Sequence, residues 1–102
     1  MALRGAVMTR GSSGSLTISP DPIIAEKGDT LVWICRDGQH MGRFDADAPS
    51  DPAAWAGPIN RSSQPVLTIK DVDGHFPYTV TVQAGSGGPP SYGHSEVVVI
   101  RP

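Results

Sequence analysis

The stretch that most constrains the fold of this chain is residues 17–34. It contains an extended run, a bend marked by Pro20 and Pro22, a second short extended run, a turn at Gly28 and Asp29, and a long apolar run. β-Branched and aromatic residues fill the extended runs, and Pro, Gly and Asp stand between them, which is typical of short strands joined by turns. Because an apolar strand must bury its side chains against a second layer, we expect the remainder of the chain to complete a β-sandwich.

Length and composition fit one small domain that is rich in turns. With 102 residues the chain can bury one modest core, so we expect residues 1–102 to form a single domain. Its 12 glycines and 10 prolines favour turns and short strands over helices. The formal net charge of -2 provides no basic face for a phosphate backbone, which argues against nucleic-acid binding.

The sequence carries no pattern of a membrane anchor or a disulfide. No run approaches the roughly 20 apolar residues that span a bilayer, and residues 1–10 lack the continuous apolar core of a signal peptide. Cys35 is the one cysteine, which excludes an internal disulfide and implies no oxidising compartment. We therefore expect a cytoplasmic protein, or one that is exported with a leader not present in this chain.

Alternating apolar residues predict seven or eight strands. The strands are expected at residues 3–9, 15–19, 30–35, 41–45, 65–70, 78–83 and 96–101, with the second short run of residues 17–34 as the eighth. Residues 84–93 are expected to form a long loop, and residues 50–57 one short helical turn that ends at Gly57 and Pro58. The spacing predicts an all-β, antiparallel Greek-key sandwich with one short helical turn.

Trp55 and Cys35 are interpreted as structural residues. Trp55 lies in the middle of the predicted helical turn and is expected to plug the edge of the core, with an exposed contact to a partner as the alternative. Cys35 stands at the end of an apolar strand, where a free cysteine behaves as a small hydrophobe. A nucleophilic cysteine would need a base and an orienting group beside it, and no Gly-x-Ser-x-Gly motif offers a serine instead. We expect no enzyme activity.

In order and spacing, the motifs resemble those of the plastocyanin-type cupredoxins over nearly the whole chain. Residues 14–33 are similar to the second and third strands of that family. Residues 40–45 resemble its His-x-x-x-Phe-Asp motif, in which the histidine is the first copper ligand. Residues 74–80 resemble the Gly-x-Tyr-x-Phe-Tyr-Cys run that leads to the copper cysteine, and residues 96–99 resemble the closing strand. The resemblance implies a cupredoxin-like sandwich.

The ligand positions implied by this resemblance are not filled by ligand residues. Val80 stands in place of the copper cysteine and Gln83 in place of the second histidine, and no methionine follows Met41. Only His40 occupies a ligand position, whereas a blue-copper site needs a thiolate and two imidazoles in a trigonal arrangement. We expect no type 1 copper centre, no electron transfer through one and no cofactor.

The leading hypothesis is a copper-free, cupredoxin-like binding or structural module that contacts an unknown protein partner. Loops on a rigid sandwich commonly carry recognition, and the resemblance places the relevant loops at the former copper end. The residues expected to bind the partner, drawn from residues 39–44 and 86–94, are Met41, Phe44, Pro89, Pro90 and Tyr92. The loop at residues 85–88 is otherwise read as a simple connector, because it has no lysine and opens no helix.

Two alternatives stay open from the sequence. The first is weak binding or carriage of Cu(II) or Zn(II) by His40 and His94, which the resemblance places at one end of the sandwich with His75 at the far end. The second is an immunoglobulin-like subunit of a larger assembly, which self-associates by edge pairing of residues 97–100. The closely spaced carboxylates are read as a solvated face, with a weak calcium site as the alternative; they are Asp45, Asp47 and Asp51.

Overall fold

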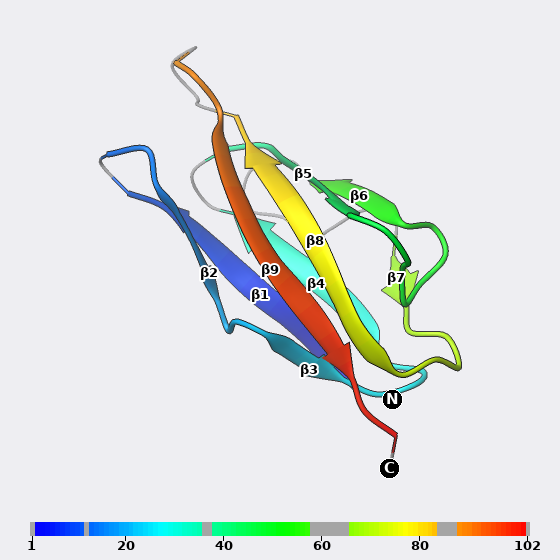
Figure 1. Cartoon of the computed structure of the whole chain (residues 1–102). Helices are drawn as coiled ribbons and strands as arrows, with labels where there is room; N and C mark the ends of the chain where they lie inside the picture. The colour runs from blue at the N-terminus through cyan, green and yellow to red at the C-terminus, as the bar shows by residue number, and fades with distance from the viewer. Residues whose placement is uncertain (1, 12, 36–37, 58–65, 84–87, 102) are drawn as a thin grey trace.

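The computed structural model describes residues 2–11, 13–35, 38–57, 66–83 and 88–101 (Figure 1). Nine strands lie within these ranges: β1 (Leu3–Arg10), β2 (Leu16–Ser19), β3 (Ile23–Ala25), β4 (Thr30–Cys35), β5 (His40–Phe44), β6 (Ala54–Gly57), β7 (Leu67–Thr68), β8 (Gly74–Val82) and β9 (Ser91–Val99). The predicted all-β class is confirmed, with one strand more than the upper expectation. No helix in the described ranges is long and apolar enough to cross a membrane.

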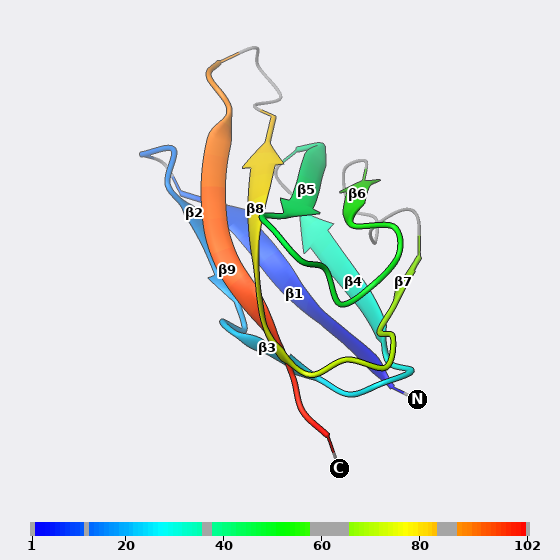
Figure 2. The ribbon, with the colours of Figure 1, turned by 45° about the vertical axis from the view of Figure 1, so that its right-hand side comes forward.

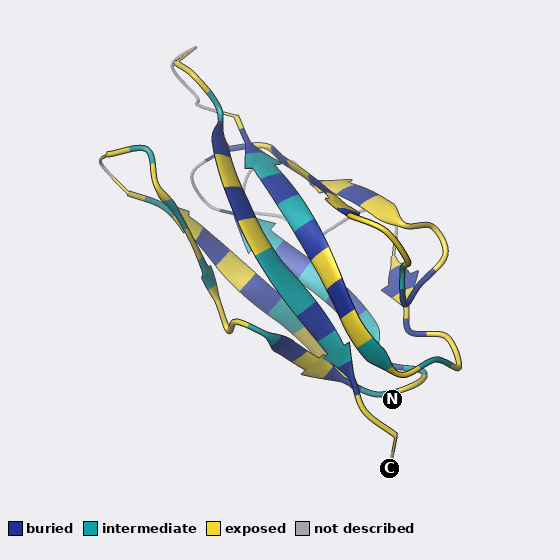
Figure 3. Cartoon of the chain, in the orientation of Figure 1, coloured by how far each residue is buried: buried dark blue, intermediate teal, exposed yellow. Residues whose placement is uncertain are grey.

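The strands form two packed layers. One sheet has the order β2-β1-β4-β7, and the other has the order β3-β9-β8-β5-β6. Figure 2 shows β1 passing behind β9 and β8, with its sheet neighbour β4 to the right of β8. Along β8 buried residues alternate with more exposed ones, so one face of this strand packs into the core and the other faces outward (Figure 3).

Both sheets are mixed, so the expectation of a wholly antiparallel sandwich is wrong. β1 runs parallel to β4, and β3 runs parallel to β9, whereas the other pairs are antiparallel. The reason lies in the proline-marked bend, after which the chain leaves the first sheet and joins the second. Side-chain periodicity reports which face of a strand is buried, but it does not report which strand is the neighbour.

Residues 17–34 fold as the sequence predicts, with two short strands, two bends and a long apolar strand. At the second turn Gly28 has a φ of 87°, which glycine adopts without a steric penalty, and the Asp29 N–H donates to the Glu26 carbonyl at 3.0 Å. The buried Asp29 carboxylate accepts hydrogen bonds from the backbone N–H of Glu26 and of Ala2, and from Arg4 Nε. This carboxylate therefore ties the start of β1 to the turn before β4.

The predicted helical turn at residues 50–57 is wrong. Ala54–Gly57 is the strand β6, which pairs antiparallel with β5. Ala54 lies opposite Arg43 at one end of this pairing, and Gly57 lies opposite His40 at the other. The alanines favour a helix locally, but the strand lets Trp55 point inward while its neighbours point outward. Trp55 is 3% exposed, so its expected role as a plug at the core edge is confirmed on an edge strand instead of a helix.

The predicted loop at residues 84–93 is too long, because β9 begins at Ser91 and pairs with β8 without interruption. Gly93, the last residue of the predicted loop, lies within β9 where the space for a side chain is absent. A Cβ added there would lie 2.8 Å from Leu16 Cδ2 of β2, so the two sheets approach each other closely at this position. The remaining loop residues 84–87 lie outside the described part of the chain.

Aromatic side chains fill the core between the sheets. The rings of Trp33 and Trp55 are stacked, with centroids 3.7 Å apart and an interplanar angle of 12°. Tyr78 meets Trp33 edge-on at 5.3 Å, and Phe44 meets Tyr78 edge-on at 6.0 Å. Pairs of this kind add about 0.5–1.5 kcal/mol beyond the burial of their surface. Cys35 is fully buried at the end of β4, as expected for a structural cysteine.

Candidate binding surface

His40 lies in the interior and does not present its imidazole to solvent. It is 1% exposed, and neither ring nitrogen has a hydrogen-bond partner among the described residues. Its strand neighbours are Gly57 on one side and Val82 on the other, and a Cβ added to Gly57 would lie 2.3 Å from His40 Cε1. Desolvation by burial lowers the pKa of His40, so the ring is neutral at pH 7.

The surroundings of His40 do not fit a type 1 copper centre. Val80 and Val82, the β8 residues that face the same interior, are fully buried and apolar. Gln83, which stands in place of the second histidine of the resemblance, is exposed. Across the described ranges no group of three or more His, Cys, Asp or Glu residues could hold a metal ion. One imidazole beside Val82 and Gly57 offers no thiolate and no second imidazole.

The alternative metal pair, His40 and His94, is not brought together. His94 lies on β9 and is exposed on the outer face of the sheet, where its Nδ1 is 3.0 Å from Thr79 Oγ1. His40 faces the core from the opposite side of the same sheet. The two rings cannot share one ion, so this alternative is wrong. His75 lies at the start of β8, at the end of the sandwich away from His40, as the sequence suggested. Its Nδ1 is 3.2 Å from Glu96 Oε1.

The basis of the immunoglobulin-like alternative is also wrong. The apolar run at residues 97–100 was expected to be a sheet edge that could pair with another molecule. Instead β9 is an inner strand, paired with β3 on one side and with β8 on the other. Val97–Val99 is therefore paired on both sides, and the Ile100 N–H donates to the Ala25 carbonyl at 2.9 Å. The described edges of this sheet are β3 and β6.

Two of the residues predicted to contact a partner lie in one row across the outer face of the sheet. Met41 of β5 is opposite Thr81 of β8, which in turn is opposite Tyr92 of β9. Met41 is 58% exposed and Tyr92 is 62% exposed. We call these residues the Met41–Tyr92 row. Met41 was expected at the start of a strand and Tyr92 in a long loop, but both lie on paired strands.

The other predicted contact residues have mixed positions. Phe44 is 5% exposed and packs in the aromatic core, so it cannot contribute to an exposed surface. Pro89 is exposed and Pro90 is half-buried, just before Tyr92 on the chain. Arg10 Nη2 donates to the Pro89 carbonyl at 3.3 Å, and Arg10 Nε donates to Ser91 Oγ at 2.7 Å. These bonds anchor the proline segment to β1.

A second row on the same outer face carries polar and charged groups. Arg43 of β5 is opposite Thr79 of β8, which is opposite His94 of β9. Thr79 Oγ1 donates to Asp45 Oδ1 at 2.7 Å and also lies against His94 Nδ1. The predicted solvated carboxylates are all exposed, in agreement with expectation; they are Asp45, Asp47 and Asp51.

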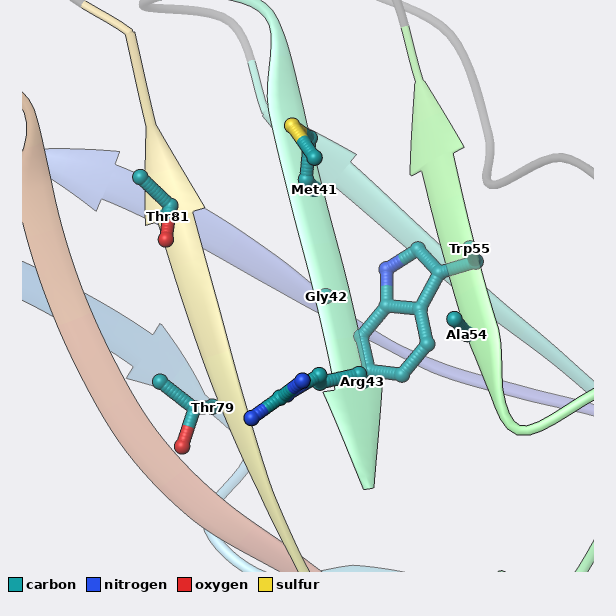
Figure 4. A pocket seen from close by; sticks show the side chains of 7 residues that line it. All are labelled: Met41, Gly42, Arg43, Ala54, Trp55, Thr79 and Thr81. Atoms are coloured by element: carbon teal, nitrogen blue, oxygen red, sulfur yellow. The ribbon is translucent and has the colours of Figure 1, made fainter. Parts of the chain in front are cut away.

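A hollow of about 210 Å³ lies between the two rows (Figure 4). We call it the Arg43 pocket; its lining residues are Met41, Gly42, Arg43, Ala54, Trp55, Thr79 and Thr81. No motif in the sequence predicted this pocket, although the pattern of its strands indicated which side chains face outward. The clean alternation in residues 78–83 places Thr79 and Thr81 outward, and the same alternation in residues 40–44 places Met41 and Arg43 outward.

No protein-family model and no curated protein matches the sequence. Solved structures do match the fold. A pseudoazurin from Sinorhizobium is 23% identical with a TM-score of 0.59, and the match covers 100% of this chain and 76% of the other. A methionine-to-alanine mutant of amicyanin in its Cu(I) form is 21% identical with a TM-score of 0.53, covering 94% of this chain and 82% of the other. A reduced Cu(I) form of a proline-to-glycine amicyanin mutant is 22% identical, with the same TM-score of 0.53.

Proposed function

We propose that this chain, which has the cupredoxin fold of pseudoazurin and amicyanin, is a non-catalytic binding module that contacts a protein partner without a copper centre. The partner would dock on the outer face of the β3-β9-β8-β5-β6 sheet, at a docking surface made of Met41, Pro89, Pro90 and Tyr92. One observation carries this proposal. Met41 and Tyr92 are both more than half exposed, and they lie in one row of paired strands.

The chemistry of these side chains supports protein recognition. Tyrosine and methionine are enriched in protein interfaces, because they supply large contact areas and, for tyrosine, a polar tip. Met41 lies on a strand paired on both sides, and Tyr92 is paired with Thr81 of β8, so little conformational freedom is lost when a partner docks. The prolines extend the same surface and are anchored through Arg10.

The interior at His40 supports the other half of the proposal, which is the absence of redox chemistry. In place of the thiolate of a blue-copper centre this chain has Val80, and its nearest neighbours on the same buried face of β8 are Tyr78 and Val82. The scaffold is retained while the ligands are replaced. Such a domain can keep a recognition role that depends only on its surface, since fold and site chemistry are separable.

Affinity capture from the native host with a matched set of variants tests the docking surface. The baits are wild type, Met41→Ala, Tyr92→Ala and the control Leu3→Ala, whose side chain is 70% exposed on the opposite sheet. We expect capture of at least one protein to be reduced at least tenfold by each of the first two changes and unaffected by the control, since interface anchors contribute about 2 kcal/mol or more. Direct binding of that protein is then measured by calorimetry with purified components.

The proposal fails if neither Met41→Ala nor Tyr92→Ala weakens any captured protein relative to wild type. It also fails if Leu3→Ala weakens the same proteins equally, because the effect would then reflect general apolar adhesion. All three side chains are largely exposed, so truncation to alanine should leave the fold intact, and circular dichroism checks this directly.

A further inference from the structure

We propose that the Arg43 pocket binds a small carboxylic acid with an apolar body. This pocket is distinct from the protein-docking surface proposed above, although Met41 belongs to both. The inference rests on three features of the pocket: its shape, the composition of its walls and the charge at one end.

The shape of the pocket follows from the register of three strands. Met41 and Arg43, two residues apart on β5, stand at opposite ends of the hollow, with Gly42 between them (Figure 4). Thr79 and Thr81 of β8 form one side, and β6 forms the other. Because Gly42 has no side chain, the indole of Trp55 packs against its backbone; an added Cβ would lie 2.2 Å from Trp55 Cζ2.

The walls are mainly apolar. The Met41 thioether, the Ala54 methyl group and the threonine methyl groups provide apolar surface, whereas Trp55 is 3% exposed and contributes little of it. The volume of about 210 Å³ is smaller than the range typical of drug-sized ligands, which is roughly 300–1,000 Å³. The pocket therefore suits a compact molecule of about eight to twelve non-hydrogen atoms.

The charge at one end decides the ligand class. Within the described ranges Arg43 makes no ion pair, and Figure 4 shows its side chain extending along the pocket towards β8. Asp45 is two residues along the chain, but its carboxylate accepts the hydrogen bond from Thr79. A guanidinium at the end of an apolar hollow is matched by a carboxylate joined to an apolar body, since this group binds guanidinium through two parallel hydrogen bonds.

Phenylacetate and hexanoate are suitable probes, because each joins one carboxylate to a compact apolar body. We expect each to shift the backbone amide signals of Met41, Gly42, Thr79 and Thr81 in two-dimensional NMR spectra, with a Kd of about 1 mM for so small a ligand. Phenylacetamide has nearly the same shape without the charge. It should bind at least tenfold more weakly, because it lacks the charge-assisted pair with Arg43.

Two variants with the same change of charge separate the pocket from general electrostatics. Arg43→Gln should weaken phenylacetate about tenfold and leave phenylacetamide unchanged. Lys70→Gln removes an exposed cation away from the pocket and should change neither. If phenylacetate and phenylacetamide bind equally, if Arg43→Gln has no effect, or if the shifted signals lie away from the pocket, the proposal is overturned.

The outcome is independent of the protein-docking test. Tyr92 does not line the pocket, so Tyr92→Ala should reduce partner capture without changing the affinity for phenylacetate. Arg43→Gln should do the reverse. Loss of one activity with retention of the other therefore identifies which of the two proposals has failed.

Discussion

At the scale of single residues, Asp29 shows how one buried charge organises an end of this sandwich. It lies at 2% exposure and receives hydrogen bonds from two backbone N–H groups and from Arg4. Desolvation raises the pKa of this carboxyl, but the hydrogen bonds from Glu26 and Ala2 and the charge of Arg4 outweigh it, and the net pKa is lowered. The ionised form is therefore the one that stabilises the fold.

Replacing this carboxylate tests its contribution and its pH dependence. Asp29→Asn should lower the free energy of unfolding at pH 7 by about 2 kcal/mol, measured by urea denaturation, because an amide satisfies the same donors less well. The folded pKa lies below the unfolded value of about 3.9, so the wild-type advantage is complete above pH 5. It should disappear as the pH falls through the folded pKa.

A matched control for this change is Asp47→Asn, at an exposed carboxylate. It should leave the free energy of unfolding within about 0.5 kcal/mol of wild type. A constant gap between wild type and Asp29→Asn from pH 7 to pH 2.5 would contradict the assigned role of the charge.

At the same scale, two valines separate this chain from a copper protein. Val80 and Val82 present methyl groups to the interior shared with His40, and none of these atoms is a metal ligand. This difference was visible in the sequence, because residue identity alone decides whether a thiolate is present. The sequence did not reveal that His40 is itself buried, or that its ring packs closely against Gly57.

At the scale of elements, β6 is the clearest departure from expectation. Residues 50–57 have a proline near the start, three alanines and a closing glycine, which are local signals of a helix. The structure instead pairs Ala54–Gly57 with β5 and turns Trp55 onto Trp33. Nucleating a short helix is costly, whereas the edge of an existing sheet offers backbone hydrogen bonds and a core position for the indole.

A substitution in β6 distinguishes the two conformations by the sign of its effect. Ala56 is exposed and lies opposite Met41. Ala56→Thr should raise the free energy of unfolding by about 0.5 kcal/mol in urea denaturation, because threonine favours strands and alanine favours helices. A loss of stability of similar size would indicate that the segment prefers a helical turn.

At the scale of the whole molecule, the cupredoxin fold persists although only one position of the copper ligand set holds a ligand residue. The sandwich is held by the aromatic core and by strand pairing, and neither depends on a metal. Adding Cu(II) should therefore produce no intense thiolate-to-copper absorption band and leave the Tm unchanged, since a ligand that does not bind the folded state cannot stabilise it.

An amicyanin sample in the same buffer serves as the positive control for copper loading. A blue absorption band in the protein described here, or a rise in its Tm that grows with Cu(II) concentration, would contradict the absence of a type 1 centre. The blue band would require Cys35 as the thiolate ligand, because it is the one cysteine of the chain.

The sequence by itself determined the class of fold and the lack of a copper ligand set. Alternating apolar residues locate buried strand faces, glycines and prolines locate turns, and a valine cannot act as a thiolate. These properties are local, so they can be read from neighbouring residues.

Only the tertiary structure decided which strands are neighbours, and the candidate site depends on that choice. Pairing β5 with both β6 and β8 brings Met41 and Arg43 beside Ala54 and Thr79, and the further pairing with β9 adds Tyr92 to the same face. It also places His40 and His94 on opposite faces of one sheet. Pairing partners are set by long-range packing of the core, in which residues far apart in the chain must fit together, and no short-range pattern encodes that fit.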